Sequence, residues 1–476
     1  MGNAGILDYR KFRAIDAEKI RMLLLFSCYH QIFCVMDEHI ESQLKSPGKT
    51  IPFRHGVGCV SNLCRNGFSE EESVWYVGVF YQIRRAYYFI SRNLIGSSPC
   101  MHAFKRRLWN NLFTHDIGNY ETCMWDRMEE FSVLLVGETG SGKGSAASAL
   151  GYSGFVPYDL AKKCFAFDFQ DAFVAANLSQ YSQSLLESEL FGHRKGAFTG
   201  ALSDYDGLFA RCRAFGSVFL DEIGDMPLTL QAKLLRAIES RTIQRVGGAE
   251  DIKIDLRLIC ATHRDLEKKV ESGDFRADLF FRINVLPINV PTLAERRTDI
   301  PSLYETLLKN LQIDKSVEPI FTPEAITALS KHNWPGNVRE LKNVIERACI
   351  IFPGKEVTSS NVYENLLRLK VPSIAEEQEA IWELTSDLAE INNVDIDQTT
   401  NQEDFLPHPK NYKNWFTFYD EIDLRRHLQD VEIVLIEEAL EKTNGKIALA
   451  ADKLKLRRTT LIEKMKKYSI TSNQSN

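Results

Sequence analysis

The chain has 476 residues, of which 44% are hydrophobic and 26% are charged, and its formal net charge is −6. This length predicts about two to four domains, and the composition is that of a soluble globular protein. The negative net charge excludes a protein that binds nucleic acid over its whole surface, so any such surface must be local. The ten cysteines show no zinc-binding spacing, and we expect reduced thiols in a cytoplasmic protein.

The first predicted domain, residues 1–94, is rich in aromatic and aliphatic residues at helical spacing. Its apolar run Ile20–Met36 contains Arg21 and His30 and falls short of the ~20 apolar residues that a membrane span needs. We interpret this run as a buried helix of a soluble domain and expect no membrane contact. The segment holds no catalytic constellation, so we expect a regulatory or sensory domain.

An α/β domain is predicted at residues 95–293, followed by a helical lid at 294–355. Apolar strands are expected at 131–136, 173–176, 217–220 and 256–261, with helical segments between them. This alternation is typical of a parallel sheet with crossover helices. The lid has helical spacing that is interrupted at Trp334-Pro335-Gly336.

A phosphate-binding loop follows the first strand. Its glycines let successive backbone N–H groups face a phosphate, and the helix behind the loop adds its positive end. Lys143 supplies a charge to the β- and γ-phosphates of ATP. Gly144 stands where a Mg²⁺-binding Ser or Thr usually follows, so another group or water must hold the metal. The predicted nucleotide contacts of this loop are Gly137, Glu138, Thr139, Gly140, Ser141, Gly142, Lys143 and Gly144.

Two carboxylates follow the strand at 217–220. Asp221 is placed to hold Mg²⁺, and Glu222 to orient and deprotonate the attacking water. The strand at 256–261 runs into Thr262 and His263, where His263 can sense the γ-phosphate. Together with the glycine loop, these residues predict an ATPase that uses ATP and Mg²⁺.

A hexapeptide of small residues with one ring and one hydroxyl lies between the glycine loop and the carboxylates. Its residues are Gly196, Ala197, Phe198, Thr199, Gly200 and Ala201. Hydrolysis of ATP requires no such loop, whereas a protein that pushes on a partner needs a protruding, apolar, flexible finger. We interpret the hexapeptide as that finger.

Three arginines are candidates for contact with the nucleotide. In a ring ATPase, Arg276 and Arg282 can reach the nucleotide of the neighbouring subunit and stabilise transition-state charge there. Arg339 begins a helix after the turn at 334–337 and can contact the nucleotide from the lid.

An acidic linker is predicted at 356–419, because residues 375–404 carry many carboxylates and no Lys or Arg. The last domain, residues 420–476, begins with an amphipathic helix at 423–442 that we expect to pair two subunits. Helices at 446–454 and 457–468 then have helix-turn-helix spacing, and the second suits the major groove of double-stranded DNA. Lys455 occupies their turn, where the Fis-type DNA-binding domain that this segment resembles often has glycine, and a left-handed backbone would tolerate lysine less well.

The predicted DNA contacts lie on the second of these helices. We expect the residues at its start to face bases, and later lysines to contact phosphates. These residues are Arg457, Arg458, Thr459 and Thr460 for the bases and Lys464, Lys466 and Lys467 for the phosphates.

Ordered motifs give the chain a family resemblance. They are the glycine loop, Glu187–His193 leading into the hexapeptide, Leu220–Gly224 and Trp334–Leu341. With them the chain resembles the sigma-54-dependent bacterial enhancer-binding proteins of the NtrC type, including their Fis-type helix-turn-helix. The resemblance implies a AAA+ ATPase that forms a hexameric ring, binds DNA upstream of promoters and remodels the closed complex of sigma-54 RNA polymerase.

The same resemblance implies roles for individual residues. The hexapeptide would contact sigma-54 through Phe198 and Thr199, and Asn177 would couple Glu222 to it. The trans-acting arginines and the lid arginine of the family are matched by Arg276, Arg282 and Arg339. The chain departs from the family pattern at Gly144, where Glu is usual, at His263, where Asn is more common, and in a longer stretch at 151–172.

Two other classes of function stay open at this point. One is a DNA-binding repressor whose ATPase only gates oligomerisation, so that the hexapeptide is idle. The other is a ring unfoldase or helicase, which the helix-turn-helix and the acidic linker disfavour.

Overall fold

The structure is a computed structural model of the chain. It describes residues 8–114, 118, 120–125, 127, 130–312, 314–315, 317–367, 424–443, 446–456 and 458–468. The chain divides into two compact units, Met1–Val371 and Pro372–Asn476, and each is treated by itself. The predicted acidic linker lies outside the described residues from residue 368 onward.

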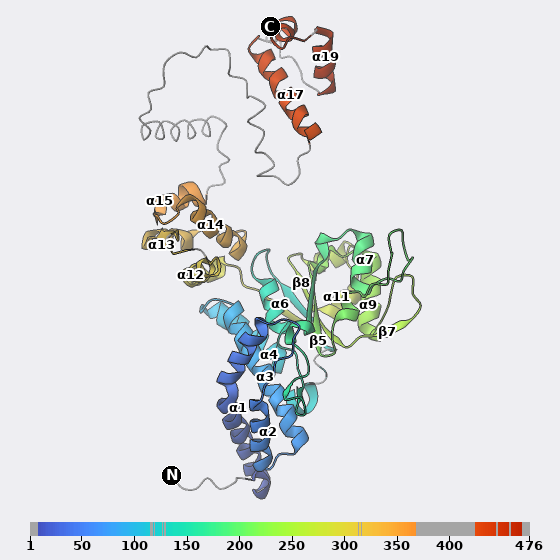
Figure 1. Cartoon of the computed structure of the whole chain (residues 1–476), viewed down its shortest axis with the longest axis vertical. Coiled ribbons are helices and arrows are strands. Elements are labelled where there is room, and N and C mark those ends of the chain that lie inside the picture. The colour runs from blue at the N-terminus through green and yellow to red at the C-terminus, as the bar shows by residue number, and fades with distance from the viewer. Residues whose placement is uncertain are drawn as a thin grey trace. The chain divides into compact units, whose positions relative to one another are not determined.

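Long helices begin the first unit (Figure 1). They are α1 (Ala14–Leu44), α2 (His55–Arg65), α3 (Glu70–Asn93) and α4 (Pro99–Phe113), with the short 3-10 helix η1 (Tyr9–Lys11) before and the short π-helix η2 (Tyr120–Met124) after them. α3 begins at a capping box in which the side chains of Ser69 and Glu72 each accept the other's backbone N–H.

The long helix α1 is buried along one face only. Leu25, Ile32 and Met36 lie on that face, whereas Leu23 and Phe26 are exposed. The prediction of a buried helix over residues 20–36 is therefore right for one face and wrong for the other. α1 is long and apolar enough to cross a membrane. Length and composition alone are weak evidence for this, because core helices of soluble proteins meet the same criteria.

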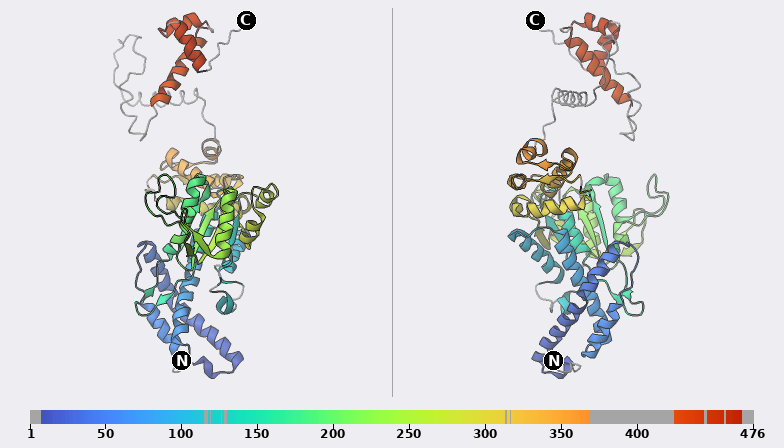
Figure 2. Two further views of the ribbon diagram at one scale, coloured as in Figure 1. Left: turned by 90° about the vertical axis from the view of Figure 1, so that its right-hand side faces the viewer. Right: turned by 60° about the vertical axis from the view of Figure 1, so that its left-hand side comes forward.

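The α/β domain contains a five-stranded parallel sheet in the order β4–β5–β8–β1–β9 (Figures 1 and 2). Its strands are β1 (Val133–Val136), β4 (Phe173–Asn177), β5 (Gly216–Asp221), β8 (Leu256–Thr262) and β9 (Leu286–Asn289). The first four confirm the predicted strands. The fifth is not among them, because it is short and contains Pro287, which a strand tolerates at the edge of a sheet.

Helices and short hairpins connect these strands. The helices are α6 (Lys143–Gly151), α7 (Gln183–Phe191), α8 (Leu208–Arg211), α9 (Leu228–Ser240), α10 (Leu266–Glu271) and α11 (Ala277–Ile283), with turns η4 (Phe169–Ala172), η5 (Leu178–Gln180) and η6 (Ile223–Asp225). The antiparallel pairs are β2 (Tyr158–Asp159) with β3 (Cys164–Phe165), and β6 (Thr242–Gln244) with β7 (Asp251–Lys253).

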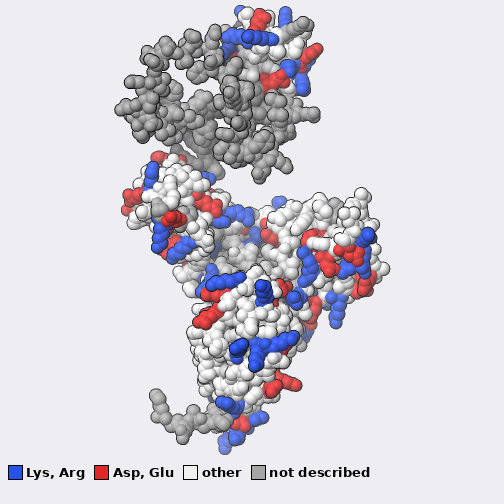
Figure 3. Space-filling model, in the orientation of Figure 1, with Lys and Arg blue, Asp and Glu red and all other residues white. Residues whose placement is uncertain are grey.

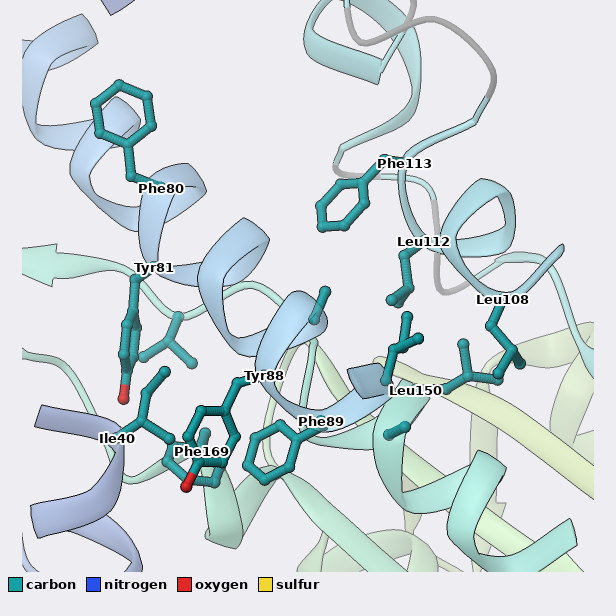
Figure 4. Close-up of a cluster of buried hydrophobic side chains, with 14 of the residues drawn as sticks. Ile40, Phe80, Tyr81, Tyr88, Phe89, Leu108, Leu112, Phe113, Leu150 and Phe169 are labelled. Atoms are coloured by element: carbon teal, nitrogen blue, oxygen red, sulfur yellow. The ribbon is translucent and has the colours of Figure 1, made fainter. Parts of the chain in front are cut away.

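The N-terminal helices share one hydrophobic core with the α/β domain. Figure 4 shows side chains of α3 and α4 gathered with Leu150 of α6 and with Phe169. The fully buried Arg85 of α3 donates to the carbonyls of Tyr152 and Gly154, both at 2.6 Å. The predicted boundary at residue 94 therefore crosses a continuous core, and removal of residues 1–94 would expose it.

The long stretch at 151–172 supports the N-terminal helices. Tyr81 of α3 stacks on Phe165 of β3 with ring centroids 3.8 Å apart. Gly78 of α3 passes so close to Phe155 that a Cβ at this position would lie 2.9 Å from the ring. The extra length of this stretch thus has a structural role, because it forms the surface on which α3 packs.

Acidification is expected to destabilise this region through His39, which is 7% exposed among the rings of Phe53, Tyr81 and Phe165. Burial, and to a lesser extent the positive charge of Arg85, lower the pKa of His39 to about 4, although the negative charge of Asp168 opposes the shift. The unfolded chain therefore takes up this proton first as the pH falls below about 6.5. Stability is full above that pH and decreases toward pH 4, by about 2 kcal/mol between pH 7 and pH 5.

Urea unfolding at the two pH values measures this effect. His39→Phe places a ring that cannot be protonated in the same aromatic environment. In this variant the free energy of unfolding should fall by about 2 kcal/mol less between pH 7 and pH 5 than in the wild type. His30→Gln, on the exposed side of the same helix, serves as the control and should keep it. An equal loss in wild type and His39→Phe would contradict the assignment.

The lid has its own hydrophobic core. It consists of η7 (Ala294–Asp299), α12 (Ile300–Asn310), α13 (Pro323–Lys331), α14 (Asn337–Ile351), α15 (Ser359–Asn361) and η8 (Val362–Leu366), with β10 (Ile320–Phe321) paired to β11 (Glu356–Val357). Val357, Val362 and Leu366 are buried in this core. The lid therefore extends past the predicted end at residue 355.

The second unit contains α17 (Leu424–Glu441), α18 (Ile447–Lys453) and α19 (Arg458–Lys467). Ile436, Ala450 and Leu461 belong to its small core. Lys455 in the turn between α18 and α19 has a φ of 51°, the left-handed conformation that its position predicts. The predicted pair of helices joined by a tight turn is confirmed.

Candidate functional site

The phosphate-binding loop joins β1 to the N-terminus of α6. Gly142 has a φ of 110°, and no atom lies within 4 Å of the position that a Cβ would take at Gly142 or at Gly144. Lys143, which is 6% exposed, donates from Nζ to the carbonyls of Gly137 at 2.8 Å and Glu138 at 3.1 Å. The open space beside these glycines, the ammonium and the helix N-terminus together fit a phosphate chain.

The lid is fastened to this loop by Asn337, whose own φ is 53°. Its side-chain oxygen accepts from the N–H of Leu293 at 2.7 Å, and its amide donates to Glu138 Oε2 at 2.9 Å and to the carbonyl of Thr139 at 3.2 Å. The next residue, Val338, donates its N–H to the carbonyl of Gly140 at 3.0 Å. Asn337 is absent from the predicted site residues, although it lies in the turn that the sequence singled out.

Arg339 also lies against the loop. A Cβ at Gly140 would come within 3.0 Å of the Cβ of Arg339, so the lid helix packs directly on the loop backbone. Ser141 is held from the other side by the buried Arg296, which donates to its carbonyl at 3.0 Å. Two lid arginines thus border the predicted nucleotide contacts.

The two carboxylates that the sequence predicts to be catalytic, Asp221 and Glu222, stand at the end of β5 near Lys143. Glu222 has φ 56° and ψ 48°, a strained conformation of the kind that clusters at functional sites. One of its oxygens lies 4.0 Å from Lys143 Nζ. The other accepts a hydrogen bond from Nδ1 of His263 at 2.6 Å. The structure thus brings three predicted site residues together.

Among the hydrogen bonds of the described residues, none joins Asn177 to Glu222. Its side-chain oxygen accepts from the backbone N–H and the hydroxyl of Ser179, both at 3.0 Å. It does lie beside Asp221 in the sheet register. The side chain that is hydrogen-bonded to Glu222 is that of His263, and the coupling role of Asn177 stays a prediction.

Burial shifts the pKa values of two charged groups here. It lowers the pKa of the Lys143 ammonium, an effect that the negative charges of Glu222 and Asp221 oppose. It raises the pKa of the Asp221 carboxyl, and the neighbouring charge of Glu222 adds to that shift while Lys143 opposes it. A cation beside Asp221 would favour its charged form, so this carboxyl suits a metal ligand.

ATP and Mg²⁺ fit the groups present. Carboxylate oxygens such as those of Asp221 are ligands that Mg²⁺ prefers, whereas Gly144 offers no side-chain oxygen. Within the described part of the chain, no group of three or more His, Cys, Asp or Glu residues could hold a metal ion. The remaining ligands of such an ion would be phosphate oxygens and water, as is usual for Mg²⁺.

A cavity of about 630 Å³ borders Gly137 and Glu138 of the loop. Phe104 and Arg107 of α4 line its other side, together with residues that follow β9. Its size and position suit the nucleoside part of ATP. The sequence did not predict that α4 lines this cavity, because α4 precedes the phosphate-binding loop in the chain and contains no recognisable motif.

Arg276 and Arg282 are both exposed near α11. Arg276 pairs with Asp278 at 2.7 Å. Among the hydrogen bonds and ion pairs of the described residues, neither arginine reaches the loop or the β5 carboxylates of its own chain.

The hexapeptide forms an exposed tip. Its base is closed by hydrogen bonds from Gly196 N to the carbonyl of Ala201 at 2.9 Å and from Ala201 N to the carbonyl of Phe198 at 3.0 Å. Phe198 is 40% exposed and Thr199 is exposed, whereas Ala201 is buried at 6% exposure. The structure thus divides the predicted contact residues into a free tip and a buried base.

Charged side chains fix the chain just outside the hexapeptide. Arg194 pairs with Asp204 and with Glu250, both at 2.7 Å. His193 pairs through its backbone with Tyr205 and stands against the ring of Phe198, with centroids 4.9 Å apart. Figure 3 shows charges of both signs gathered in the region of α7 and β7. The tip therefore projects from a base that is held in place.

In the second unit, the predicted base contacts Arg458 and Thr459 are exposed and Thr460 is half-buried. Lys464 is not free, because its ammonium pairs with Glu432 of α17, whose other oxygen accepts from the hydroxyl of Tyr468 at 2.6 Å. Arg457 lies outside the described residues.

Comparison with known families and proteins agrees with this arrangement. Residues 118–289 match the Sigma-54 interaction domain, residues 294–378 the AAA+ ATPase lid domain, and residues 427–468 the Bacterial regulatory protein, Fis family. The chain is 34% identical over 382 residues to the response regulator protein PilR of Pseudomonas aeruginosa, covering 80% of this chain and 71% of PilR.

Two further relatives are matched over smaller shares of their length. The DNA-binding transcriptional regulator NtrC of Rhizobium meliloti is 34% identical over 351 residues, which cover 73% of this chain and 66% of NtrC. The DNA-binding transcriptional activator HyfR of Escherichia coli is 36% identical over 383 residues, which cover 78% of this chain and 50% of HyfR. By these motifs and matches, the chain belongs to the sigma-54-dependent bacterial enhancer-binding proteins, with a AAA+ sigma-54 interaction domain, its lid and a Fis-type helix-turn-helix.

Proposed function

We propose that this protein is a sigma-54-dependent transcriptional activator that binds DNA upstream of promoters and uses ATP hydrolysis to open the sigma-54 RNA polymerase complex. The observation that carries the proposal is the exposed tip at Phe198 and Thr199, on the segment that leads from β4 to β5. An ATPase site alone would not require this tip. Such a function belongs in the bacterial cytoplasm, where transcription takes place.

The proposed hydrolysis step uses three groups of the chain. Lys143 binds the phosphates of ATP, Asp221 contributes a carboxylate to Mg²⁺, and Glu222 takes a proton from the attacking water. Mg²⁺, when bound, would neutralise charge on the phosphate oxygens. The hydrogen bond from His263 fixes the orientation of the Glu222 carboxylate before hydrolysis.

The coupling between hydrolysis and the tip runs along a short stretch of chain. Asn177 lies beside Asp221 in the sheet and caps η5 by accepting from Ser179. η5 leads into α7, and α7 leads into the hexapeptide. A change at the γ-phosphate that moves the end of β4 would therefore move α7 and with it Thr199.

We further propose that the protein acts as an oligomeric ring, with six subunits as in its family. The exposure of Arg276 and Arg282, away from their own nucleotide site, supports action on a neighbouring subunit. The second unit would pair subunits through α17, where Val434 and Leu435 are exposed at 57% and 50%. Each pair would bind one pseudo-palindromic DNA site.

Mixing two inactive variants tests the ring. Glu222→Gln lacks the base but keeps its arginines, and Arg282→Ala keeps the base but lacks an arginine. A mixture is expected to hydrolyse ATP at least about tenfold faster than either variant alone, because an arginine finger acts in trans. The measurement is steady-state phosphate release at a fixed total protein concentration.

The matched control for this mixture is Arg264→Ala, an exposed arginine of the same domain that pairs with Asp225. Arg264→Ala should hydrolyse ATP on its own at about the wild-type rate. Mixing it with Glu222→Gln should therefore not raise the rate further. If the Glu222→Gln and Arg282→Ala mixture stays as inactive as its components, Arg282 does not act on a neighbour.

Single-round transcription tests the proposal as a whole. Transcripts are expected only when this protein, ATP and sigma-54 polymerase are all present on a promoter with an upstream binding site. Repression of a promoter that is active without the protein would favour a repressor instead.

A further inference from the structure

A second cavity, of about 220 Å³, lies among the N-terminal helices and shares no lining residue with the nucleotide cavity. It lies between α1 and α3, which run side by side in Figures 1 and 2. Leu25 and Phe26 of α1 face Val79 and Phe80 of α3 across it, and Tyr120 and Glu121 of η2 complete the lining. Its surface is almost entirely apolar and rich in aromatic rings.

The polar groups that border this cavity already have protein partners. Arg21 donates to the Tyr76 hydroxyl and pairs with Glu121 at 3.1 Å. The Tyr120 hydroxyl donates to Gln82 Oε1 at 2.7 Å. A charged ligand would lose its hydration here without gaining an unpaired counter-charge, which is costly. A neutral ligand avoids that cost.

Size and access narrow the ligand further. Apolar cavities of about 150 Å³ take up benzene, so this one has room for a ring with a small substituent but not for a helix of a partner protein. Its rim is open to solvent, since Phe26 is 63% exposed and Met22 is 43% exposed. The face of these helices seen in Figure 3 is mostly uncharged.

We propose that the cavity between α1 and α3 is a binding site for a neutral, apolar molecule about the size of one substituted aromatic ring. Aromatic side chains on both helices provide the stacking surfaces that such a ring prefers. The proposal does not depend on the proposed role in transcription, because its evidence is the lining of this cavity alone.

Tyr120 links this site to the phosphate-binding helix. Gln82, which accepts from the Tyr120 hydroxyl, donates from Nε2 to the carbonyl of Ser153 at 3.1 Å. Ser153 lies just past the C-terminal end of α6, and Lys143 is the first residue of α6. A ligand that packs on the Tyr120 ring would therefore restrain the far end of the helix that carries Lys143.

Calorimetric titration of the full chain with toluene tests the site. One toluene per chain is expected to bind, and Phe26→Ala should weaken binding by about fivefold to tenfold because a ring contact is lost. Leu23→Ala is the matched control, since Leu23 is equally exposed on α1, at 66%, but does not line the cavity. This variant should bind toluene as wild type does.

Two further measurements make the test decisive. Val79→Phe, which fills the cavity, should abolish toluene binding, and benzylammonium, which adds a charge to the same ring, should not bind to the wild type. Absence of toluene binding up to its solubility limit, or equal affinity in Phe26→Ala and Leu23→Ala, would overturn the proposal. A dimer that Phe26→Ala dissociates, without any toluene binding, would assign this face to a second copy of the chain instead.

Hydrogen exchange tests the link to α6 without relying on hydrolysis. Toluene should slow amide exchange over residues 143–154 by about threefold in the wild type. Tyr120→Phe keeps the ring but loses the hydroxyl, so it should bind toluene without this protection. The same protection in Tyr120→Phe would overturn the link while leaving the binding site intact.

Discussion

Replacement of Glu222 by Gln is expected to lower the rate of ATP hydrolysis by about 10²–10⁴-fold, the usual contribution of a general base. The amide keeps the shape of the side chain and can still meet His263, but it cannot accept the proton of the attacking water. ATP binding should persist, because Lys143 and the loop backbone remain in place. Phosphate release measures the first effect, and fluorescent nucleotide titration measures the second.

Asp225→Asn is the matched control for this variant. Asp225 lies three residues further along and pairs with Arg264 at 3.4 Å and with Lys269 at 3.8 Å, away from the phosphate-binding loop. Its replacement should leave hydrolysis within about twofold of wild type, as for surface substitutions away from special features. Persistent turnover in Glu222→Gln would show that another group acts as the base.

Replacement of Thr199 by Ala is expected to lower activated transcription by about 30-fold or more, the effect of losing a central contact at an interface. Hydrolysis should stay within about twofold of wild type, because Thr199 is exposed and lies outside the nucleotide site. No hydrogen bond of its side chain is present among the described residues, so the fold should not change. Transcription and phosphate release are measured on the same preparation.

Ser203→Ala is the matched control for Thr199. Ser203 offers an exposed hydroxyl a few residues further along the same loop but outside the hexapeptide. Its loss should alter neither activity. Equal transcription from Thr199→Ala and Ser203→Ala would show that the hexapeptide is idle, as a repressor would require.

Much of the fold could be predicted from the sequence, because its strongest signals are local. One apolar run leads into the glycine loop at Gly137, and the structure forms it as strand β1. Another ends at the acidic Asp221, and the structure forms it as strand β5. The helix-turn-helix was predictable from two short helices around Lys455. Edge strand β9 was not, since its four residues include a proline.

The positions of the domain boundaries depend on long-range packing, which the sequence shows poorly. The composition of residues 1–94 differs from that of the α/β domain and suggests a separate domain. In the structure, however, Arg85 and Tyr81 pack against the segment at 151–172. The lid extends beyond 355 because Val357 and Leu366 close its core, and single apolar residues in a polar stretch give little sign of that.

The nucleotide site was predictable in its motifs but not in all its contacts. Lys143, Asp221 and Glu222 meet as the motifs require. The hydrogen bond between His263 and Glu222 depends on how β5 and β8 are paired, and the role of Asn337 depends on how the lid closes on the loop. Contacts of this kind join distant parts of the chain and leave no periodic pattern.

Promoter opening by this protein can be followed directly through the reactivity of unpaired thymines toward permanganate. The DNA carries a sigma-54 promoter and an upstream site for the second unit, with sigma-54 polymerase already bound in its closed complex. We predict that thymines near the start site become reactive with wild-type protein and ATP, but not with Thr199→Ala or with a non-hydrolysable ATP analogue. Opening by Thr199→Ala, or opening without ATP hydrolysis, would contradict the proposed function of the hexapeptide and of the ATPase.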